Sequence, residues 1–237
     1  MHKLVCMIFL GALVSSCATN KPDAIKHDTS SQVNNAEKYL DDGLVFVSTG
    51  SLKKAIDEFD QAIKICDNQY SNKKTTVFAS RGQVETLYYM LLAASTNLQA
   101  IAVDTTCSDA LYFRGYAELD LGNLELAQTY VERAIAMAPV NSKYLSELGH
   151  IHQTNKKWND ALEVFSTSEE SADVYSPEKL KNKELMRAKR GVAFALTELN
   201  RIDEAESKYK ECLKIDPNDK NSLHELAYLK SLRAKKN

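Results

Sequence analysis

The amino-acid sequence predicts an all-α protein built as a solenoid of stacked helix pairs. A series of small and bulky residues recurs along the chain, and it is most complete at Gly115, Ala127, Val131, Ala134 and Pro139. Further copies are Gly43, Ala55, Phe59 and Ala62; Gly149, Ala161, Phe165 and Ser168; and Ala193, Ala205, Tyr209, Cys212 and Pro217. The copies that begin at Gly115 and at Gly149 lie 34 residues apart. A fixed period of this length is typical of helical repeat arrays, in which each unit packs only on its neighbours.

The composition of the chain agrees with this fold class. Of the 237 residues, 44% are hydrophobic and 26% are charged, which is ordinary for a globular protein. Eight glycines and four prolines are too few for a turn-rich all-β fold or a long disordered chain. The formal net charge of −2 gives no reason to expect the clustered basic surface that nucleic acid binding needs, so we expect no nucleic-acid partner.

Five helix pairs and a final capping helix are expected in the segment from residue 34 to residue 237. The first pair covers residues 35–67, the third 108–139 and the fourth 142–171, each with helical spacing of its apolar residues. The second pair, residues 75–105, is degenerate, because Tyr88-Tyr89-Met90 stands at the turn where a glycine is expected. The last helix, 219–235, carries leucines on one face and Lys and Arg on the other, as a soluble terminal cap requires.

The fifth pair begins ten residues later than the period requires. Ser176-Pro177-Glu178 has the chemistry of a helix start, with a serine cap, a proline at the first helical position and an acidic residue in the first turn. We therefore expect the inserted residues to lengthen the first helix of this pair, from Pro177 to about Leu199, rather than to form a loop. The second helix of the pair is expected at 202–215.

The first residues of the chain have the pattern of an export signal. A short basic start precedes the apolar run from Leu4 to Val14, which is too short to span a bilayer because spanning needs about 20 residues. The sequence Leu13-Val14-Ser15-Ser16-Cys17 resembles the bacterial lipobox, in which the cysteine becomes the acylated first residue of the mature protein. The resemblance implies a signal peptide over residues 1–16 and lipid on Cys17. Ala18, rather than Asp, follows the cysteine, which in that family favours the outer membrane.

Two other interpretations of the leader remain open. Val14 and Ser16 also fit the cleavage site of an ordinary secretory signal, and the apolar run could be the first helix of a cytosolic protein. Residues 17–33 contain little that a core could bury and are predicted to be a flexible tether. Fifteen such residues would reach roughly 20 Å, enough to hold a domain away from a membrane.

Residues 36 to 217 resemble the tetratricopeptide repeat (TPR) family. The two middle repeats carry the resemblance, although the tryptophan of the consensus first helix is replaced throughout. The resemblance implies a right-handed solenoid whose concave wall, built by the first helix of each pair, binds other proteins. With the lipobox in front, the chain is similar to periplasmic TPR lipoproteins of Gram-negative bacteria. These include the pilotin of type IV pili, a component of outer-membrane barrel assembly and adaptors for cell-wall hydrolases.

The concave wall of the family can be carried onto this chain position by position. The residues that would line a partner-binding groove are Leu40, Leu44, Tyr112, Tyr116, Arg187, Arg190 and Phe194, with Val47, Ala79, Gln83, Thr86, Leu119, His150 and Gln153 beside them. Chaperone-binding TPR domains hold a peptide carboxylate with Lys and Asn, and the leucines stand at the first two of these positions, so that use is not expected. The two tyrosines would serve either as binding anchors or as packing for the next helix.

Catalytic and metal-binding motifs are not found in the sequence. His150 and His152 form an H-x-H pair, and on a helix their rings would point about 200° apart, whereas metal ligands need to share one face. The chain contains no G-x-S-x-G, P-loop or C-x-x-C motif. We therefore expect neither enzymatic activity nor a metal, and no cofactor other than the covalent lipid at Cys17.

Three cysteines remain after the leader and Cys17. Cys212 stands at an alanine position of the repeat, so we expect a small buried apolar residue. Cys66 and Cys107 lie near matching ends of adjacent repeats, in a compartment that permits disulfides. They are either bonded to each other or two unrelated thiols about 10 Å apart, which is the spacing of neighbouring helices.

The sequence thus predicts a protein-binding adaptor or assembly scaffold, held by lipid on the periplasmic face of the outer membrane. Its partners would be other proteins or peptides of the cell envelope, and the sequence does not indicate an oligomeric state. A second hypothesis is a peptidoglycan- or glycan-binding accessory factor, because the faces of Tyr112 and Tyr116 would pack on a sugar ring as readily as on an apolar side chain. A pilotin-like factor for pilus assembly is a third.

Overall fold

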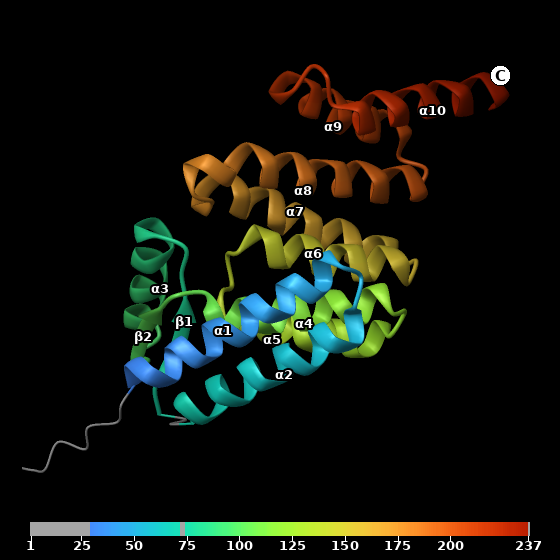
Figure 1. The fold of residues 1–237 in the computed structure, drawn as a ribbon. Helices are drawn as coiled ribbons and strands as arrows, with labels where there is room; N and C mark the ends of the chain where they lie inside the picture. The colour runs from blue at the N-terminus through green and yellow to red at the C-terminus, as the bar shows by residue number, and fades with distance from the viewer. Residues whose placement is uncertain (1–28, 72–73, 237) are drawn as a thin grey trace, which may run out of the picture.

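The computed structural model describes residues 29–71 and 74–236, and the side chains of 35–71 and 74–234 among them. The elements in this part of the chain are α1 (Thr29–Ser48), α2 (Leu52–Gln69), β1 (Thr76–Ala79), α3 (Gln83–Ser95), β2 (Ala100–Val103), α4 (Thr106–Asp120), α5 (Leu124–Met137), α6 (Ser142–Thr154), α7 (Trp158–Tyr175), α8 (Glu178–Glu198), α9 (Ile202–Ile215) and α10 (Lys220–Lys236). The helices stack from the blue N-terminal pair to the red C-terminal helices (Figure 1). The predicted all-α solenoid is confirmed.

The N-terminal end of the solenoid begins within the segment predicted as a tether. Residues 29–33 already belong to α1, and Ala36 is buried in one cluster with Cys66 and Cys107. The last residues of the predicted tether, 29–33, therefore form the first turns of α1, and this helix packs on the solenoid from Ala36 onwards. The predicted signal peptide, Cys17 and the rest of the predicted tether lie outside the described residues.

The recurring glycines and bulky residues bring the two helices of each pair together. A Cβ atom on Gly115 would lie 2.7 Å from Cγ2 of Val131, and one on Gly149 would lie 2.9 Å from ring carbons of Phe165. These distances are shorter than van der Waals contact, so the close approach of the helices requires glycine. The residues that define the sequence period are thus the residues at the helix contacts.

Tight turns with one left-handed residue join the helices within each pair. Gly50, Gly122, Lys156 and Asn200 have φ angles of 72°, 83°, 57° and 60°. The residue after each of them donates its backbone N–H to a carbonyl five residues back, as Asn123 does to Glu118 at 2.9 Å. This bond satisfies a carbonyl that the end of the helix leaves without a partner. The same turn marks four helix pairs, α1–α2, α4–α5, α6–α7 and α8–α9, in the described part of the chain.

The predicted second helix pair is wrong. Residues 76–103, which we call the insert, form β1–α3–β2, and the two strands run parallel with Thr76 opposite Ala100. Their sequences, TVFA and AIAV, combine β-branched and small residues that suit a strand. Phe78 of β1 stacks on Tyr89 of α3, with 5.0 Å between ring centroids. The tyrosines expected at a turn therefore lie inside α3, and the wall positions predicted at 79, 83 and 86 do not belong to a repeat helix.

A disulfide and an ion-pair cluster hold the insert in place. Cys66 at the end of α2 is bonded to Cys107 at the start of α4, with Cα atoms 5.7 Å apart, so the closed loop contains the whole insert. Arg81 pairs with Glu85 of α3 and with Glu184 of α8, each at 2.6 Å. The insert is thus fixed to both the N-terminal pairs and the C-terminal half of the solenoid. The third cysteine, Cys212, is buried, as predicted.

Helix α8 spans 21 residues, so the extra residues of the fifth pair lengthen a helix, as predicted. The predicted serine cap is wrong. The backbone of Ser176 ends α7, and its hydroxyl donates to the carboxylate of Glu184, while Pro177 precedes α8 without a side-chain cap bond. Because Glu184 also binds Arg81, the lengthened part of α8 is the part to which the insert is attached.

Candidate functional site

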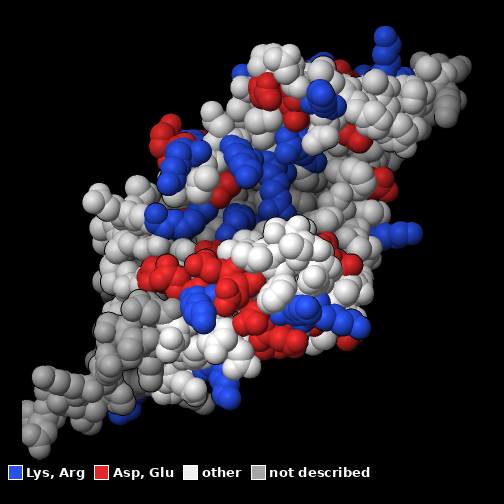
Figure 2. Space-filling view, in the orientation of Figure 1, with Lys and Arg blue, Asp and Glu red and all other residues white. Residues whose placement is uncertain are grey.

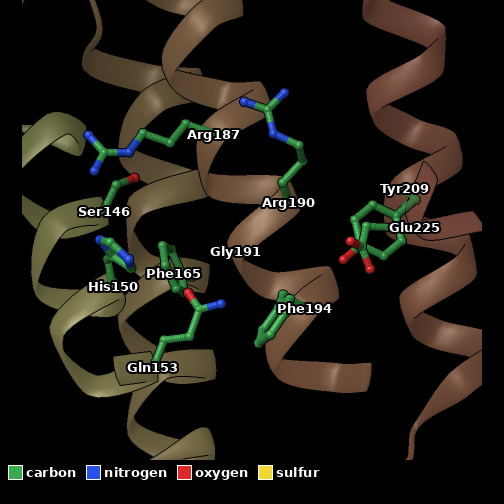
Figure 3. A pocket seen from close by; sticks show the side chains of 10 residues that line it. All are labelled: Ser146, His150, Gln153, Phe165, Arg187, Arg190, Gly191, Phe194, Tyr209 and Glu225. Atoms are coloured by element: carbon green, nitrogen blue, oxygen red, sulfur yellow. The ribbon is translucent and has the colours of Figure 1, made fainter. Parts of the chain in front are cut away.

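A pocket of about 340 Å³ opens between α6, α8 and α10. Its lining includes Ser146, His150 and Gln153 of α6, Arg187, Arg190 and Phe194 of α8, Tyr209 of α9 and Glu225 of α10. Figure 3 shows Arg187 reaching from α8 towards Ser146 on α6, with Phe194 farther along α8. Five of the wall positions carried over from the TPR resemblance therefore meet in one pocket.

A second pocket, of about 310 Å³, adjoins the first along the same helices. Ser146 and Arg187 line both pockets, and the second adds Tyr112 of α4, Lys143 of α6 and Lys183 of α8. The two pockets form one groove that runs across α4, α6 and α8. We call it the groove below.

Positive charge gathers on the α8 side of the groove. Lys183, Arg187 and Arg190 stand at helical spacings of four and three residues, so they share a face of α8 with Phe194. Figure 2 shows the blue surface of Lys and Arg concentrated over α8, while red surface lies below it, where α1 and α2 lie in Figure 1. The molecule therefore presents a basic groove although its net charge is slightly negative.

A buried carboxylate positions Arg187 in this groove. The side chain of Glu147 is 2% exposed, and its Oε2 lies 2.6 Å from Nη2 of Arg187. His150 Nδ1 lies 3.8 Å from the other carboxylate oxygen. Burial favours the neutral acid, but the neighbouring His150 together with the charge and the hydrogen bond of Arg187 outweigh it and lower the pKa of Glu147. For Arg187, burial opposes the charged form, and the Glu147 carboxylate outweighs it and raises the pKa of the guanidinium.

Arg190 is bound to the capping helix rather than to its own repeat. Its Nη1 lies 3.1 Å from the carboxylate of Asp219, which also accepts hydrogen bonds from Ser222 at the start of α10. The side chain of Arg190 is 27% exposed and remains on the pocket wall. The capping helix thus holds one of the cationic groups of the groove in place.

Tyr112 is a packing residue more than an open anchor. It is 5% exposed, stacks on Tyr144 at 5.1 Å between centroids, and carries Lys143 Nζ 4.5 Å from its ring centroid. Its hydroxyl donates to Glu147 at 3.2 Å, and burial raises its pKa. Tyr116, one turn on, is only partly buried. The two tyrosines were expected either to anchor a partner or to pack against the next helix, and the geometry of Tyr112 favours packing.

Leu40 and Leu44 do not line the groove. Leu40 is 8% exposed and belongs to the core cluster that contains Phe59 and Tyr112, and Leu44 packs against that cluster. The apolar wall of the first repeat is therefore packed against α2 and α4. The prediction that these two residues bind a partner finds no support in their position.

Several groove residues were missed by the sequence analysis. Lys183 could have been found, because it lies one helical turn before Arg187 in the lengthened helix. Ser146 is likewise one turn before His150. Tyr209 and Glu225 come from α9 and α10, outside the first-helix register, so the repeat pattern gave no signal for them.

The two histidines of the H-x-H pair lie on different faces, as predicted. The His150 side chain is 53% exposed at the groove, whereas His152 is 8% exposed as a residue and burial lowers its pKa. Among residues 29–71 and 74–236, no three His, Cys, Asp or Glu side chains lie where they could share a metal ion. In the same residues no helix has both the length and the apolar character to cross a membrane.

Family comparisons address the repeats directly. Models described as tetratricopeptide repeat match residues 93–142, 112–175 and 192–219. The repeats from α4 to α7, and the segment 192–219, are therefore tetratricopeptide repeats, and residues 93–103 of the first match belong to the insert. The matching models describe a repeat and not a catalytic domain, and a comparison with curated proteins finds no match.

Solved structures share the TPR fold of this chain over most of its length. The structure titled "Functional Characterization of Pseudomonas Aeruginosa pilF" matches with a TM-score of 0.60 and 13% identity, covering 86% of this chain and 72% of that chain. MamA from Desulfovibrio magneticus RS-1 matches with a TM-score of 0.55 and 14% identity, covering 84% and 86%. At these identities the likeness concerns the fold alone.

Proposed function

We propose that this protein is a lipid-anchored TPR adaptor of the cell envelope, and that its groove binds an acidic segment of another protein. The observation that carries the proposal is the face of α8 on which Lys183, Arg187 and Arg190 stand beside Phe194, opposite the polar wall of α6. TPR arrays use their concave surfaces for binding. A mixed basic and apolar wall suits a peptide with acidic and apolar side chains.

The shape of the groove favours an extended ligand. Its two adjoining pockets, about 340 and 310 Å³, run across three helices and meet at Ser146 and Arg187. A chain that lies across both would place successive side chains in successive pockets. Arg187 would mark the middle of the bound segment.

The contact with Glu147 prepares Arg187 for such a ligand. A guanidinium has five N–H donors, and one carboxylate accepts two of them in its best geometry, so donors remain for an acidic ligand. Because Glu147 already fixes the arginine side chain, less conformational freedom is lost on binding. Glu147 is thus a positioning residue of the groove.

We also propose that acylated Cys17 holds the protein on the periplasmic face of the outer membrane. The lipobox-like sequence and Ala18 support this location. Stable attachment needs more than one acyl chain, because a single chain binds membranes only marginally. Mass analysis of the N-terminal peptide should find lipid on Cys17, and Cys17→Ser should remove both lipid and membrane fractionation. An N-terminal peptide that carries no lipid on Cys17 would contradict the anchor.

The other two hypotheses receive different support. Binding of glycan by stacking needs an open aromatic face, and the ring of Tyr112 is covered by Tyr144 and Lys143, so we do not favour it. The pilotin-like alternative draws on the likeness to PilF of Pseudomonas aeruginosa, which covers 86% of this chain. That alternative is a special case of the adaptor proposal, with a pilus-assembly protein as the partner.

Photo-crosslinking in intact cells tests the groove. A crosslinking residue at Gln153, on the pocket wall, should capture the partner, and one at the exposed Glu163 of α7 should not. Lys183→Glu should reduce capture about fivefold or more, since it reverses a charge that faces the ligand. Lys64→Glu makes the same change on an exposed position of α2 outside the groove and should leave capture unchanged. Equal capture from both positions, or equal loss in both variants, would reject the groove as the binding site.

A further inference from the structure

Helix α3 presents an apolar face to solvent. Val84, Leu87 and Leu91 lie at positions i, i+3 and i+7 of the helix and are 57%, 62% and 60% exposed. These three residues are the apolar face of α3. Single exposed aliphatic residues are common on proteins, but a contiguous group of them usually marks an interaction surface.

The opposite side of α3 is apolar as well. Tyr89 is fully buried and Ala93 nearly so, and both pack in a cluster with Phe78. A helix with apolar residues on two opposite sides is normally covered on both, either in a larger protein or in a membrane. The apolar face therefore lacks a cover in the described chain.

The insert itself contributes almost no charge around the apolar face. From Gln83 to Val103 the sequence has one charged residue, Glu85, which is 1% exposed and paired with Arg81. A protein partner usually finds a polar rim around an apolar centre. Charged side chains border the apolar face only at one end, where Asp173, Glu178 and Lys181 line a pocket together with Val84, and neither Leu87 nor Leu91 lines that pocket. A face with so incomplete a rim suits hydrocarbon better than it suits a second protein.

The apolar face is part of a firmly attached element. The disulfide between Cys66 and Cys107 closes the base of the insert, and Arg81 and Tyr88 join it to Glu184 and Tyr175 of the C-terminal half. Its exposure is thus built into the fold. A rigid face can fix the orientation of the whole solenoid on whatever covers it.

The N-terminal end of the described chain lies at the same edge of the molecule as the insert. Ala36 of α1 shares a buried cluster with Cys107, which follows β2 by four residues. Figure 1 shows α1 starting at the edge where β2 and α3 lie. Cys17 precedes Thr29 by twelve residues, which span at most about 40 Å when fully extended. An acyl chain on Cys17 would therefore keep this edge close to the bilayer.

We propose that the apolar face of α3 inserts into the bilayer surface beside the lipid anchor and orients the solenoid on the membrane. The proposal rests on the anchor proposed above, because tethering raises the effective concentration of the membrane and lets a weak contact form. Burial of the aliphatic side chains among the acyl chains supplies the driving force. The face would bind zwitterionic lipid, since Lys181, the cation beside Val84, is paired with Asp173.

Tryptophan quenching by brominated lipids tests this contact in the full-length lipoprotein. The chain has one tryptophan, so Leu91→Trp is made in a Trp158→Phe background, and Leu223→Trp on α10 serves as the matched control of 47% exposure. Both are reconstituted in phosphatidylcholine vesicles with chains brominated at mid-depth. The fluorescence of the Leu91→Trp protein should fall at least threefold relative to unbrominated vesicles, and that of the Leu223→Trp protein should not change.

The outcomes separate this proposal from the anchor. Lipid found on Cys17 without quenching at position 91 overturns the α3 contact and leaves the anchor standing. Quenching at 91 in Cys17→Ser protein added to the vesicles would show that α3 binds without the anchor. Equal quenching at 91 and 223 would indicate nonspecific adsorption and overturn the proposal. So would concentration-dependent dimerisation in solution that Leu87→Gln with Leu91→Gln abolishes, because a second copy would then be the cover.

Discussion

The α6–α9 helices and the insert differ in where they place apolar and charged residues. In α6–α9, Phe165 and Tyr209 are buried between helices, and Arg187 and Arg190 face the groove. In the insert the single charged residue of the helix is buried, and Leu87 and Leu91 face outwards. The first arrangement is that of a soluble repeat with a polar binding wall. The second arrangement leaves an apolar surface exposed to solvent, as at a site that another apolar surface covers.

The two regions also owe their stability to different interactions. Each repeat is stabilised by packing of its helices on each other and on the adjacent repeats. The insert has only two short strands and one helix, which are too few to bury a hydrophobic core of their own. A disulfide and a buried ion pair supply what the insert lacks. Substitutions in the two regions should therefore have different effects, and the predictions below exploit that difference.

Truncation of Phe165 should have the largest effect on stability. Its ring is 3% exposed and lies against Gly149 and Gly191 from two different pairs, so Phe165→Ala should lower the free energy of unfolding by about 3–5 kcal/mol. Leu91→Ala in α3 removes an exposed side chain and should change it by less than about 0.5 kcal/mol. Denaturant unfolding of both variants measures the contrast. A loss at Leu91 as large as that at Phe165 would mean that the apolar face is already covered in the isolated protein.

Removal of the disulfide should weaken the insert before the solenoid. The bond closes a sequence separation of 41 residues, so Cys66→Ser with Cys107→Ser should lower the free energy of unfolding by about 2–4 kcal/mol. Hydrogen exchange should show lost protection in α3 and retained protection in α6 and α8. Cys212→Ser, the control, removes a thiol that forms no bridge and should leave the protection of α3 unchanged. Uniform loss of protection across both regions would contradict the separate fastening of the insert.

The contact between Glu147 and Arg187 should make stability depend on acid pH. The pKa of Glu147 is lowered in the folded protein, so its stabilising contribution is fully present above the ordinary value of 4.5 and is lost as the pH falls through the lower, folded value. Glu147→Gln should cost about 1.5–2.5 kcal/mol at pH 7, as a charged hydrogen bond does. The difference from wild type should shrink steadily below pH 4.5. A constant difference from pH 7 to pH 3 would contradict the assigned role.

The smallest expected effect concerns the turns of the repeats. Lys156 occupies the left-handed position that Gly50 and Gly122 fill in other pairs, with φ 57°. Lys156→Gly should stabilise the protein by about 1 kcal/mol, because a side chain in this conformation is strained. Gly122→Ala, in the matching turn, should destabilise it by a similar amount. Thermal unfolding of the pair measures both signs, and a destabilised Lys156→Gly would show that the lysine side chain contributes more than the turn costs.

The repeats could be predicted from the sequence because their determinants are local and recur. The spacing of Gly115 and Val131 predicts a close contact between two helices, and the same spacing recurs at Gly149 and Phe165. The insert offers no such repetition. Thr76–Ala79 and Ala100–Val103 become strands because they pair with each other across 24 residues, which is a tertiary event that helical register does not encode.

The groove could be predicted only where it follows the first helices of the repeats. Arg187, Arg190 and Phe194 were found through that register, whereas Glu225 enters from the capping helix. Tyr112 lines the groove as the register predicts but is almost fully buried, and Leu40 does not line it, because packing between pairs buries both residues. The distance between adjacent helix pairs determines which wall side chains stay exposed. The period of the sequence does not predict that distance.

The central claim is that the molecule has two independent surfaces, a basic groove for a protein and an apolar face for the membrane. One vesicle preparation of the full-length lipoprotein measures both, with crosslinking from Gln153 in one arm and lipid quenching at position 91 in the other. Lys183→Glu should reduce partner capture about fivefold and leave the quenching intact. Leu87→Gln, with the reporter at position 91, should reduce the quenching and leave capture intact. If either substitution impaired both readouts while the fold was retained, the two surfaces would be one site and the account would be wrong.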